Sequence, residues 1–132
     1  MTVVMDVSGA VTILLKREKA DKFLDTLQGS TMVIAPDLYV SELTNVLWKY
    51  YAAKILTKDE CTQYIYDGID YIDRFVDSRE LWQEAFSEGI SNHHSIYDMF
   101  YLAVAKRSGG TLITNDSVLA GIGKKNHVTI CY

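Results

Sequence analysis

Short apolar runs alternate along this chain with longer stretches in which apolar residues recur at helical spacing. The short runs are rich in β-branched residues and predict buried strands, because a strand that is covered on both faces has no polar side. These runs are Thr2–Met5, Met32–Ala35, Thr111–Thr114 and Val128–Cys131, with a weaker edge-strand signal at Arg74–Val76.

The longer stretches predict helices that connect these strands. We expect helices from Ser8, over Ala20–Leu27, over Asp37–Ala53, after Thr57, over Arg79–Ile90, over Ser95–Lys106 and over Val118–Ile122. Pro36 stands where a first-turn proline is tolerated, at the start of the third helix. Alternation of strands and helices is typical of a parallel sheet covered on both faces. The chain therefore predicts a three-layer α/β/α fold with a central, mostly parallel sheet, formed by residues 1–132 as one domain.

Four acidic residues fall where this fold would bring them together. Asp6 directly follows the first strand, and Asp116 follows the Thr111–Thr114 strand. The carboxyl ends of parallel strands share one edge, where open α/β sheets build their sites. Asp98 begins a helix and Glu42 lies about one turn inside another, so both can reach the same edge. Four carboxylates repel one another unless a cation binds them, and such oxygen ligands suit Mg²⁺ or Mn²⁺.

Each acid also has a purely structural interpretation. Asp6 and Asp116 can cap the helices that follow them, and Asp98 completes a Ser95-x-x-Asp98 pattern that resembles a capping box. Glu42 lies among apolar residues, and a solvent-facing position is open to it. Only the joint placement of the four acids favours a site.

The charge balance first argues against a nucleic-acid partner. Seventeen Asp+Glu against thirteen Lys+Arg give a formal net charge of -4, so no general attraction to a polyanion is expected. Setting aside the four candidate ligands leaves thirteen acids (17 − 4) against thirteen basic residues. The acid excess therefore indicates a bound metal ion and does not exclude an RNA substrate.

Neither a membrane nor an oxidising compartment is indicated by the sequence. The first apolar run is broken at Asp6, and no apolar stretch reaches the length of a transmembrane helix. The two cysteines, Cys61 and Cys131, lie far apart and lack metal-binding spacing. We expect a cytoplasmic protein without membrane contact.

Four short motifs, in this order, resemble the PIN domain family: Val4–Ser8, Ser41–Leu47, Tyr97–Ala103 and Thr114–Asp116. Their order and spacing cover nearly the whole chain, which makes the combined signal specific. The length of the chain is similar to that of the VapC toxins of toxin–antitoxin pairs, which are metal-dependent ribonucleases. The resemblance thus implies hydrolysis of RNA phosphodiester bonds and a cognate antitoxin as partner.

The resemblance also implies roles for eight residues. It makes Asp6, Glu42, Asp98 and Asp116 the catalytic ligands of Mg²⁺ or Mn²⁺, with Ser8, Asn45, Thr114 and Asn115 as supporting polar residues. The family often has a further acid soon after the last of these carboxylates, whereas here Ser117 follows. One bound ion and two bound ions both stay open.

Basic and aromatic residues have two interpretations each. Lys16, Arg17 and Lys19 follow the first helix, and such residues either complement a helix dipole or contact an RNA backbone. His93 and His94 precede the helix of Asp98 and are interpreted as a surface loop. Six aromatic residues exceed what one pair of amphipathic helices buries and predict a homodimer or antitoxin interface: Trp48, Tyr50, Tyr51, Tyr64, Tyr66 and Tyr71.

Two other functions stay open. A phosphotransfer or phospho-accepting α/β domain would also bind Mg²⁺, with Asp6 as the phosphate acceptor, although the pattern lacks a second nearby aspartate and a lysine at a strand end. A catalytically silent PIN-like binding module would keep the fold and cleave no RNA.

Overall fold

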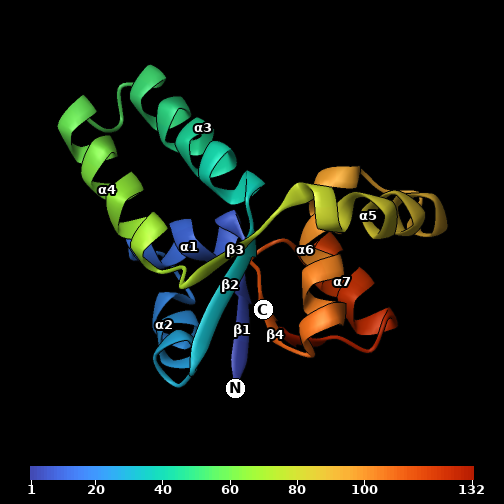
Figure 1. Cartoon of the computed structure of the whole chain (residues 1–132). Helices are drawn as coiled ribbons and strands as arrows, with labels where there is room; N and C mark the ends of the chain where they lie inside the picture. Colours follow the sequence, from blue (N-terminus) through green and yellow to red (C-terminus); the bar gives the residue numbers. More distant parts are fainter.

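Five parallel strands form the centre of the molecule (Figure 1). The computed structural model describes all of residues 1–132. The strands are β1 (Thr2–Met5), β2 (Met32–Pro36), β3 (Arg74–Val76), β4 (Thr111–Ile113) and β5 (Thr129–Cys131). They pair in the order β3-β2-β1-β4-β5, and every neighbouring pair is parallel. The predicted parallel sheet is confirmed, including the weakly signalled strand β3.

Seven helices connect the strands. They are α1 (Val7–Leu14), α2 (Ala20–Gln28), α3 (Leu38–Ala52), α4 (Lys58–Asp70), α5 (Ser78–Asn92), α6 (Ile96–Ser108) and α7 (Ser117–Lys125). Helices α1 to α4 lie on one side of the sheet and α5 to α7 on the other, which confirms the three-layer α/β/α fold (Figure 1). None of the seven has both the length and the apolar composition that crossing a membrane requires.

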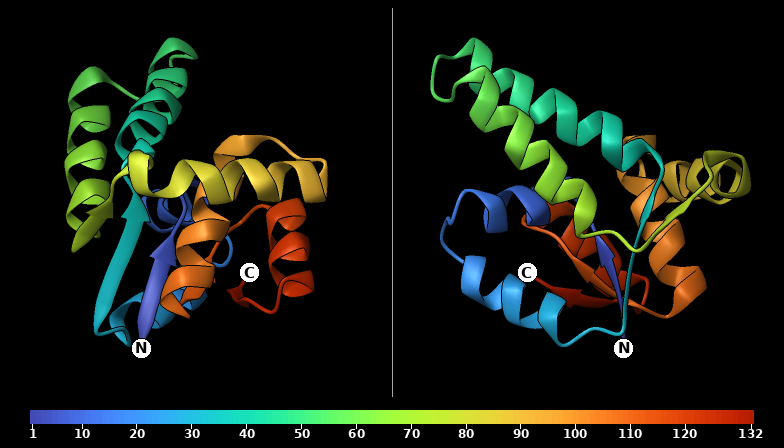
Figure 2. Two further views of the ribbon diagram at one scale, coloured as in Figure 1. Left: turned by 45° about the vertical axis from the view of Figure 1, so that its right-hand side comes forward. Right: turned by 60° about the vertical axis from the view of Figure 1, so that its left-hand side comes forward.

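The chain reverses its direction across the sheet between β1 and β4. From β1 it moves outward to β2 and β3, then crosses back to β4 and continues outward to β5. In open α/β sheets, this reversal opens a crevice at the carboxyl ends of the two central strands. Helices α3 and α4 form an antiparallel pair that extends past the carboxyl ends of the strands (Figure 2). We call this pair the α3–α4 arm.

The hydrophobic core lies on both faces of β1, whose residues Val3, Val4 and Met5 are fully buried. Helix α6 is apolar nearly all round, as the sequence predicts, and it buries Met99 and Leu102 among other residues. Because β1 and α6 are both covered by other elements, the segments that follow β1 and begin α6 are held firmly in place.

One local expectation, on Pro36, was wrong. Pro36 is the last residue of β2, where it pairs with Val76 of the edge strand, and does not form the first turn of α3. A strand end tolerates proline, because its missing N–H leaves few ladder bonds unmade. Asp37 does not cap α3 with its side chain. Its carboxylate instead accepts hydrogen bonds from the backbone N–H and the hydroxyl of Ser78, at the start of α5.

Helix α1 packs so closely on the sheet that only glycine fits at position 9. A Cβ atom there would lie 2.9 Å from Ile113 Cγ2 and 3.1 Å from the carbonyl oxygen of Ile113. We expect Gly9→Ala to push α1 away from β4 and lower the free energy of unfolding by about 1–3 kcal/mol. Urea denaturation measures this change.

Gly121 on α7 offers the matched control, because a Cβ atom there meets nothing within 4 Å. Gly121→Ala should stabilise the protein by up to about 1 kcal/mol through helix propensity. Equal stability of Gly9→Ala and the unmodified protein would show that α1 is not held against the sheet at this point.

Candidate functional site

The four predicted acids line one hollow at the carboxyl ends of β1 and β4. The hollow has a volume of about 360 Å³, and its lining includes Asp6, Glu42, Asp98 and Asp116. Two of these acids directly precede helices, one lies in the first turn of α6, and one lies in the second turn of α3. The structure thus brings together side chains that are up to 110 positions apart (116 − 6) in the sequence. We call this region the acidic hollow.

Two of the acids cap helices and still have an oxygen to offer. Asp6 Oδ1 accepts hydrogen bonds from Gly9 N at 2.8 Å and from Ser8 Oγ at 2.7 Å. Asp116 Oδ1 accepts from the backbone N–H of Val118 at 2.8 Å and of Leu119 at 3.1 Å. In both residues these bonds fall on Oδ1, which leaves Oδ2 available to a ligand. Capping and metal binding are therefore compatible here.

Glu42 is oriented by a buried tyrosine. Tyr101 donates a hydrogen bond from its hydroxyl to Glu42 Oε1 at 2.7 Å, and its side chain is buried in α6. No fully buried side-chain nitrogen or oxygen of the protein lacks a hydrogen-bond partner. The second oxygen of Glu42, which accepts no such bond from Tyr101, therefore remains accessible in the hollow.

Asp98 lies beside His94, one turn earlier in the chain. Asp98 Oδ2 is 3.7 Å from His94 Nε2. The alternative interpretation of Ser95-x-x-Asp98 as a capping box does not hold, because the side chain of Ser95 makes no capping hydrogen bond to α6. The two histidines also differ: His93 is exposed and ends α5 in a left-handed conformation, whereas His94 is partly buried against the site.

Burial and mutual repulsion raise the pKa of three of these acids. Burial raises the pKa of Asp6 to about 6, with a smaller contribution from the charge of Asp98, against the lowering effect of hydrogen bonds from Thr114, Gly9 and Ser8. Burial and then Asp98 raise the pKa of Glu42, while Tyr101 opposes the rise. Burial and then Asp116 raise the pKa of Asp98, while His94 opposes it.

Asp98 is consequently the central carboxylate of the four. Each of the other three acids interacts electrostatically with it across the hollow. A divalent cation among these carboxylates would reverse the repulsion.

The donor set fits Mg²⁺ or Mn²⁺. All four ligand candidates are carboxylates, the hard oxygen donors that these ions prefer. No three acidic, histidine or cysteine side chains converge tightly enough to hold an ion by themselves. Mg²⁺ does not need such a cage, because it is usually bound by one or two carboxylates, with water and substrate phosphates as its other ligands. Asp98 with Asp6 or with Asp116 can supply such a pair.

Three of the four predicted supporting residues form one hydrogen-bonded network behind the acids. Ser8 Oγ, besides donating to Asp6, accepts from Asn115 N at 2.8 Å and lies 3.2 Å from Thr114 Oγ1. Asn115 Nδ2 donates to Thr12 Oγ1 at 3.1 Å. This network connects the start of α1 with the segment after β4.

Asn45 is the predicted residue that the structure does not bring to the site. Its side chain is exposed on α3 and does not line the acidic hollow. The stripe of α3 that faces the hollow instead consists of Glu42, Val46 and Tyr50.

Tyr101 was missed as a site residue, and Arg17 was considered only together with Lys16 and Lys19. Tyr101 follows Asp98 by three positions, so the two share a helix face, and this spacing could have indicated it. Arg17 lines the hollow from the segment after α1, and the sequence did not distinguish it from its basic neighbours.

An α/β protein with an acidic crevice at the switch point of a parallel sheet is the class that the fold and the site define. The family model of the PIN domain matches residues 3–125. The chain therefore belongs to the PIN domain family.

Individual relatives agree with this family. The chain is 25% identical over 122 residues to "Ribonuclease VapC3" of Pyrobaculum aerophilum, a match that covers 91% of this chain and 93% of the relative. Its fold is similar to that of PAE2754 from Pyrobaculum aerophilum, with a TM-score of 0.71, 19% identity and coverage of 92% of this chain and 84% of that one.

Two further solved structures share the fold. For VapBC2 from Rickettsia felis, which was crystallised with a DNA fragment from its promoter, the TM-score is 0.65 at 14% identity, with 99% of this chain and 98% of that one covered. For FitAcB from Neisseria gonorrhoeae, the TM-score is 0.64 at 15% identity, with 98% and 96% covered.

The raised pKa of Asp6 predicts a pH-dependent stability. Between 3.8, the ordinary pKa of an aspartate, and about 6, the folded protein holds the Asp6 proton more tightly than the unfolded chain does. The stabilisation by this proton is complete below 3.8 and is lost as the pH rises through about 6. The difference between the two values corresponds to at most about 3 kcal/mol.

Asp6→Asn removes the charge and keeps an oxygen that can accept from Gly9 N. In EDTA at pH 7.5 the variant should therefore melt at a higher temperature than the unmodified protein, and the gap should close towards pH 4. Differential scanning calorimetry measures the melting temperatures at pH 7.5 and near pH 4. Asp25→Asn, on the exposed face of α2, is the control. A lower melting temperature for Asp6→Asn at pH 7.5 would contradict the burial of a charged carboxylate.

Proposed function

We propose that the protein is a metal-dependent endoribonuclease of the VapC type, the toxin of a toxin–antitoxin pair. The observation that carries this proposal is the convergence of four carboxylates, from four distant segments, on one hollow at the switch point of a PIN fold. The similarity to "Ribonuclease VapC3" supports RNA as the substrate.

Asp98, together with Asp6 or Asp116, would hold a Mg²⁺ or Mn²⁺ ion in the acidic hollow. When bound, such an ion supplies a nucleophilic water at neutral pH and positive charge against the phosphoryl oxygens. The residues of the chain itself orient the attacking water and position the substrate. Glu42, fixed by Tyr101, offers its second oxygen to orient the attacking water. Asp6 caps the start of α1 and Asp98 lies in the first turn of α6, so the positive ends of two helix dipoles face the site.

A phospho-accepting domain is less well supported. The lining of the acidic hollow includes no lysine, and Oδ1 of Asp6 is already committed to the start of α1. An RNA substrate also agrees with the cytoplasmic location predicted from the sequence.

An antitoxin and a second copy of the chain are the proposed protein partners. The α3–α4 arm exposes Trp48, Tyr51 and Tyr66, three of the aromatic residues that exceed the needs of the core. Helix α5 exposes Trp82 and Phe86, four positions apart on one face. Exposed aromatic residues of this number favour interaction surfaces. Similarity to VapBC2 of Rickettsia felis supports a partner protein.

Incubation with RNA tests the enzymatic proposal. The purified protein is mixed with a heterogeneous RNA pool and Mg²⁺ or Mn²⁺, and cleavage is followed on denaturing gels. We expect cleavage that EDTA abolishes and that Asp98→Asn lowers by at least about 100-fold, because this residue interacts with every other carboxylate of the site.

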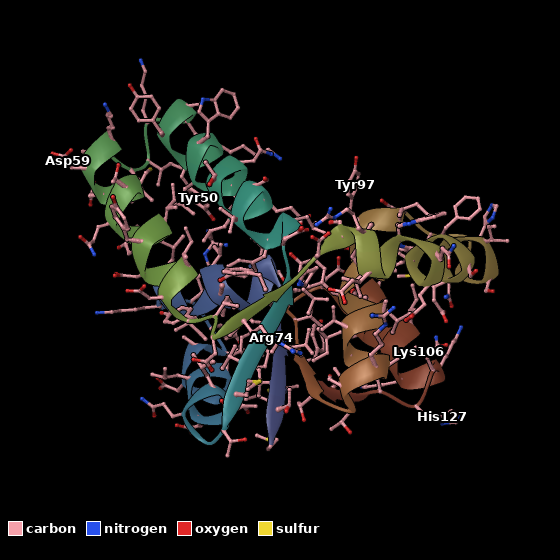
Figure 3. The ribbon with its side chains drawn as sticks, in the orientation of Figure 1. Tyr50, Asp59, Arg74, Tyr97, Lys106 and His127 are labelled. Carbon is pink, nitrogen blue, oxygen red and sulfur yellow. The ribbon has the colours of Figure 1, made fainter.

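Asp59→Asn is the matched control. Asp59 is an exposed acid at the outer end of α4, away from the hollow (Figure 3), and its substitution should leave cleavage unchanged. Cleavage that survives both EDTA and Asp98→Asn would identify a contaminating nuclease. Absence of cleavage by the well-folded, metal-supplied protein would favour the silent PIN-like module.

A further inference from the structure

Arg17 brings the only basic side chain to the lining of the acidic hollow. The lining carries four carboxylates and one guanidinium, and it includes neither lysine nor histidine. Arg17 forms no ion pair with any of these acids. Its guanidinium lies instead over the ring of Tyr50, with Cζ 5.2 Å from the ring centroid. This cation–π contact leaves the N–H groups of the guanidinium free to bind an anion.

The backbone conformation brings Arg17, and not its basic neighbours Lys16 and Lys19, to the acidic hollow. Arg17 N donates to Thr12 O at 3.0 Å, and Arg17 O accepts from Ala20 N at 3.0 Å. Lys16 and Lys19 have φ values of 53° and 73°, left-handed conformations that cost energy in residues other than glycine. Lys19 Nζ lies 3.4 Å from the ring centroid of Tyr132, and neither lysine lines the acidic hollow.

Helix α3 leads from the carboxylates to Arg17. Glu42, Val46 and Tyr50 follow one another at intervals of four residues and all line the acidic hollow. Eight residues of helix span about 12 Å, so Tyr50 is attached well beyond the acids. Figure 3 shows Tyr50 between α3 and α4, above α1.

A second hollow, of about 330 Å³, continues from this point. It shares Val46 and Tyr50 with the acidic hollow and adds Lys49 and Ile55. Its lining carries a positive charge and no carboxylate, so the surface changes from acidic to basic along α3. This change from acidic to basic surface suits an RNA strand that has one phosphate at the metal-binding acids and its next phosphates beyond them.

We propose that Arg17, stacked on Tyr50, binds the RNA phosphate next to the scissile phosphate and thereby anchors the substrate strand. The proposal rests on the proposed ribonuclease function. A guanidinium matches phosphate oxygens with two parallel N–H donors. Near a cation-loaded acidic site, the same guanidinium is repelled unless an anion lies between the two charges. A bridging RNA backbone supplies that anion.

The test compares Arg17→Gln with Lys16→Gln in the full-length chain. Each substitution removes one positive charge from the same loop, but only Arg17 lines the acidic hollow. Binding of a fluorescein-labelled, single-stranded RNA of mixed sequence is followed by anisotropy in EDTA, and cleavage of the same RNA is followed in Mg²⁺. Arg17→Gln should weaken binding and raise KM about tenfold, with kcat changed less than about twofold.

The salt dependence of RNA binding separates a phosphate contact from a purely structural role of Arg17, because a structural role would leave it unchanged. Loss of one phosphate contact should reduce the slope of log K against log salt concentration by about 0.7, whereas Lys16→Gln should leave the slope unchanged. Tyr50→Phe keeps the ring and should bind RNA like the unmodified protein. Tyr50→Leu removes the stacking surface and should weaken binding about threefold.

Several outcomes would overturn the proposal. Equal losses for Arg17→Gln and Lys16→Gln would indicate a general charge effect, and a fall in kcat at constant KM would place Arg17 in the chemical step. RNA affinity and KM unchanged by Arg17→Gln would refute the anchor, while cleavage itself would still support the ribonuclease. Binding that depends on Arg17 without any cleavage would refute the ribonuclease and retain the anchor. A protein that neither binds nor cleaves the RNA would refute both the anchor and the ribonuclease.

Discussion

Mutual repulsion among the carboxylates around Asp98 is the constraint on which the rest of the site depends. Burial and proximity raise the pKa of Asp6, Glu42 and Asp98, so the fold holds these groups in a place that disfavours their charge. Hydrogen bonds from Gly9 N and from the hydroxyl of Tyr101 offset part of this cost. The remaining repulsion would be relieved by a bound cation.

The strand order explains why this arrangement forms at one point only. Helices start after β1 and β4 on opposite sides of the sheet, and each start is capped by an aspartate. Close packing at Gly9 fixes the first of these helices against β4. The backbone N–H groups that hold Asp6 and Asp116 thus belong to the starts of two helices, and Oδ2 of each acid stays available in the crevice. Helix capping here serves the site as well as the fold.

The sequence predicts the fold and the four acids because both depend on local patterns. Buried strands are recognisable as β-branched runs, and the acid after such a strand must lie at the edge of the sheet. Contacts between helices and strands could not be predicted from such local patterns. Helical spacing put Asn45 on one face with Glu42, but the rotation of α3 against its neighbours leaves Asn45 exposed and turns Tyr50 to the hollow. Arg17 is distinguished from Lys16 by its place in the lining of the hollow and its contact with Tyr50, which no hydrophobic pattern encodes.

The central claim is that the acidic hollow binds a divalent cation through Asp98 and its neighbours. The most direct measurement is anomalous X-ray scattering at the manganese edge from crystals of the protein grown with Mn²⁺. The account predicts an anomalous peak beside the carboxylate of Asp98, with Asp6 or Asp116 as a second ligand, and no such peak in Asp98→Asn. Manganese bound only elsewhere on the molecule, or an unchanged peak in the variant, would contradict it.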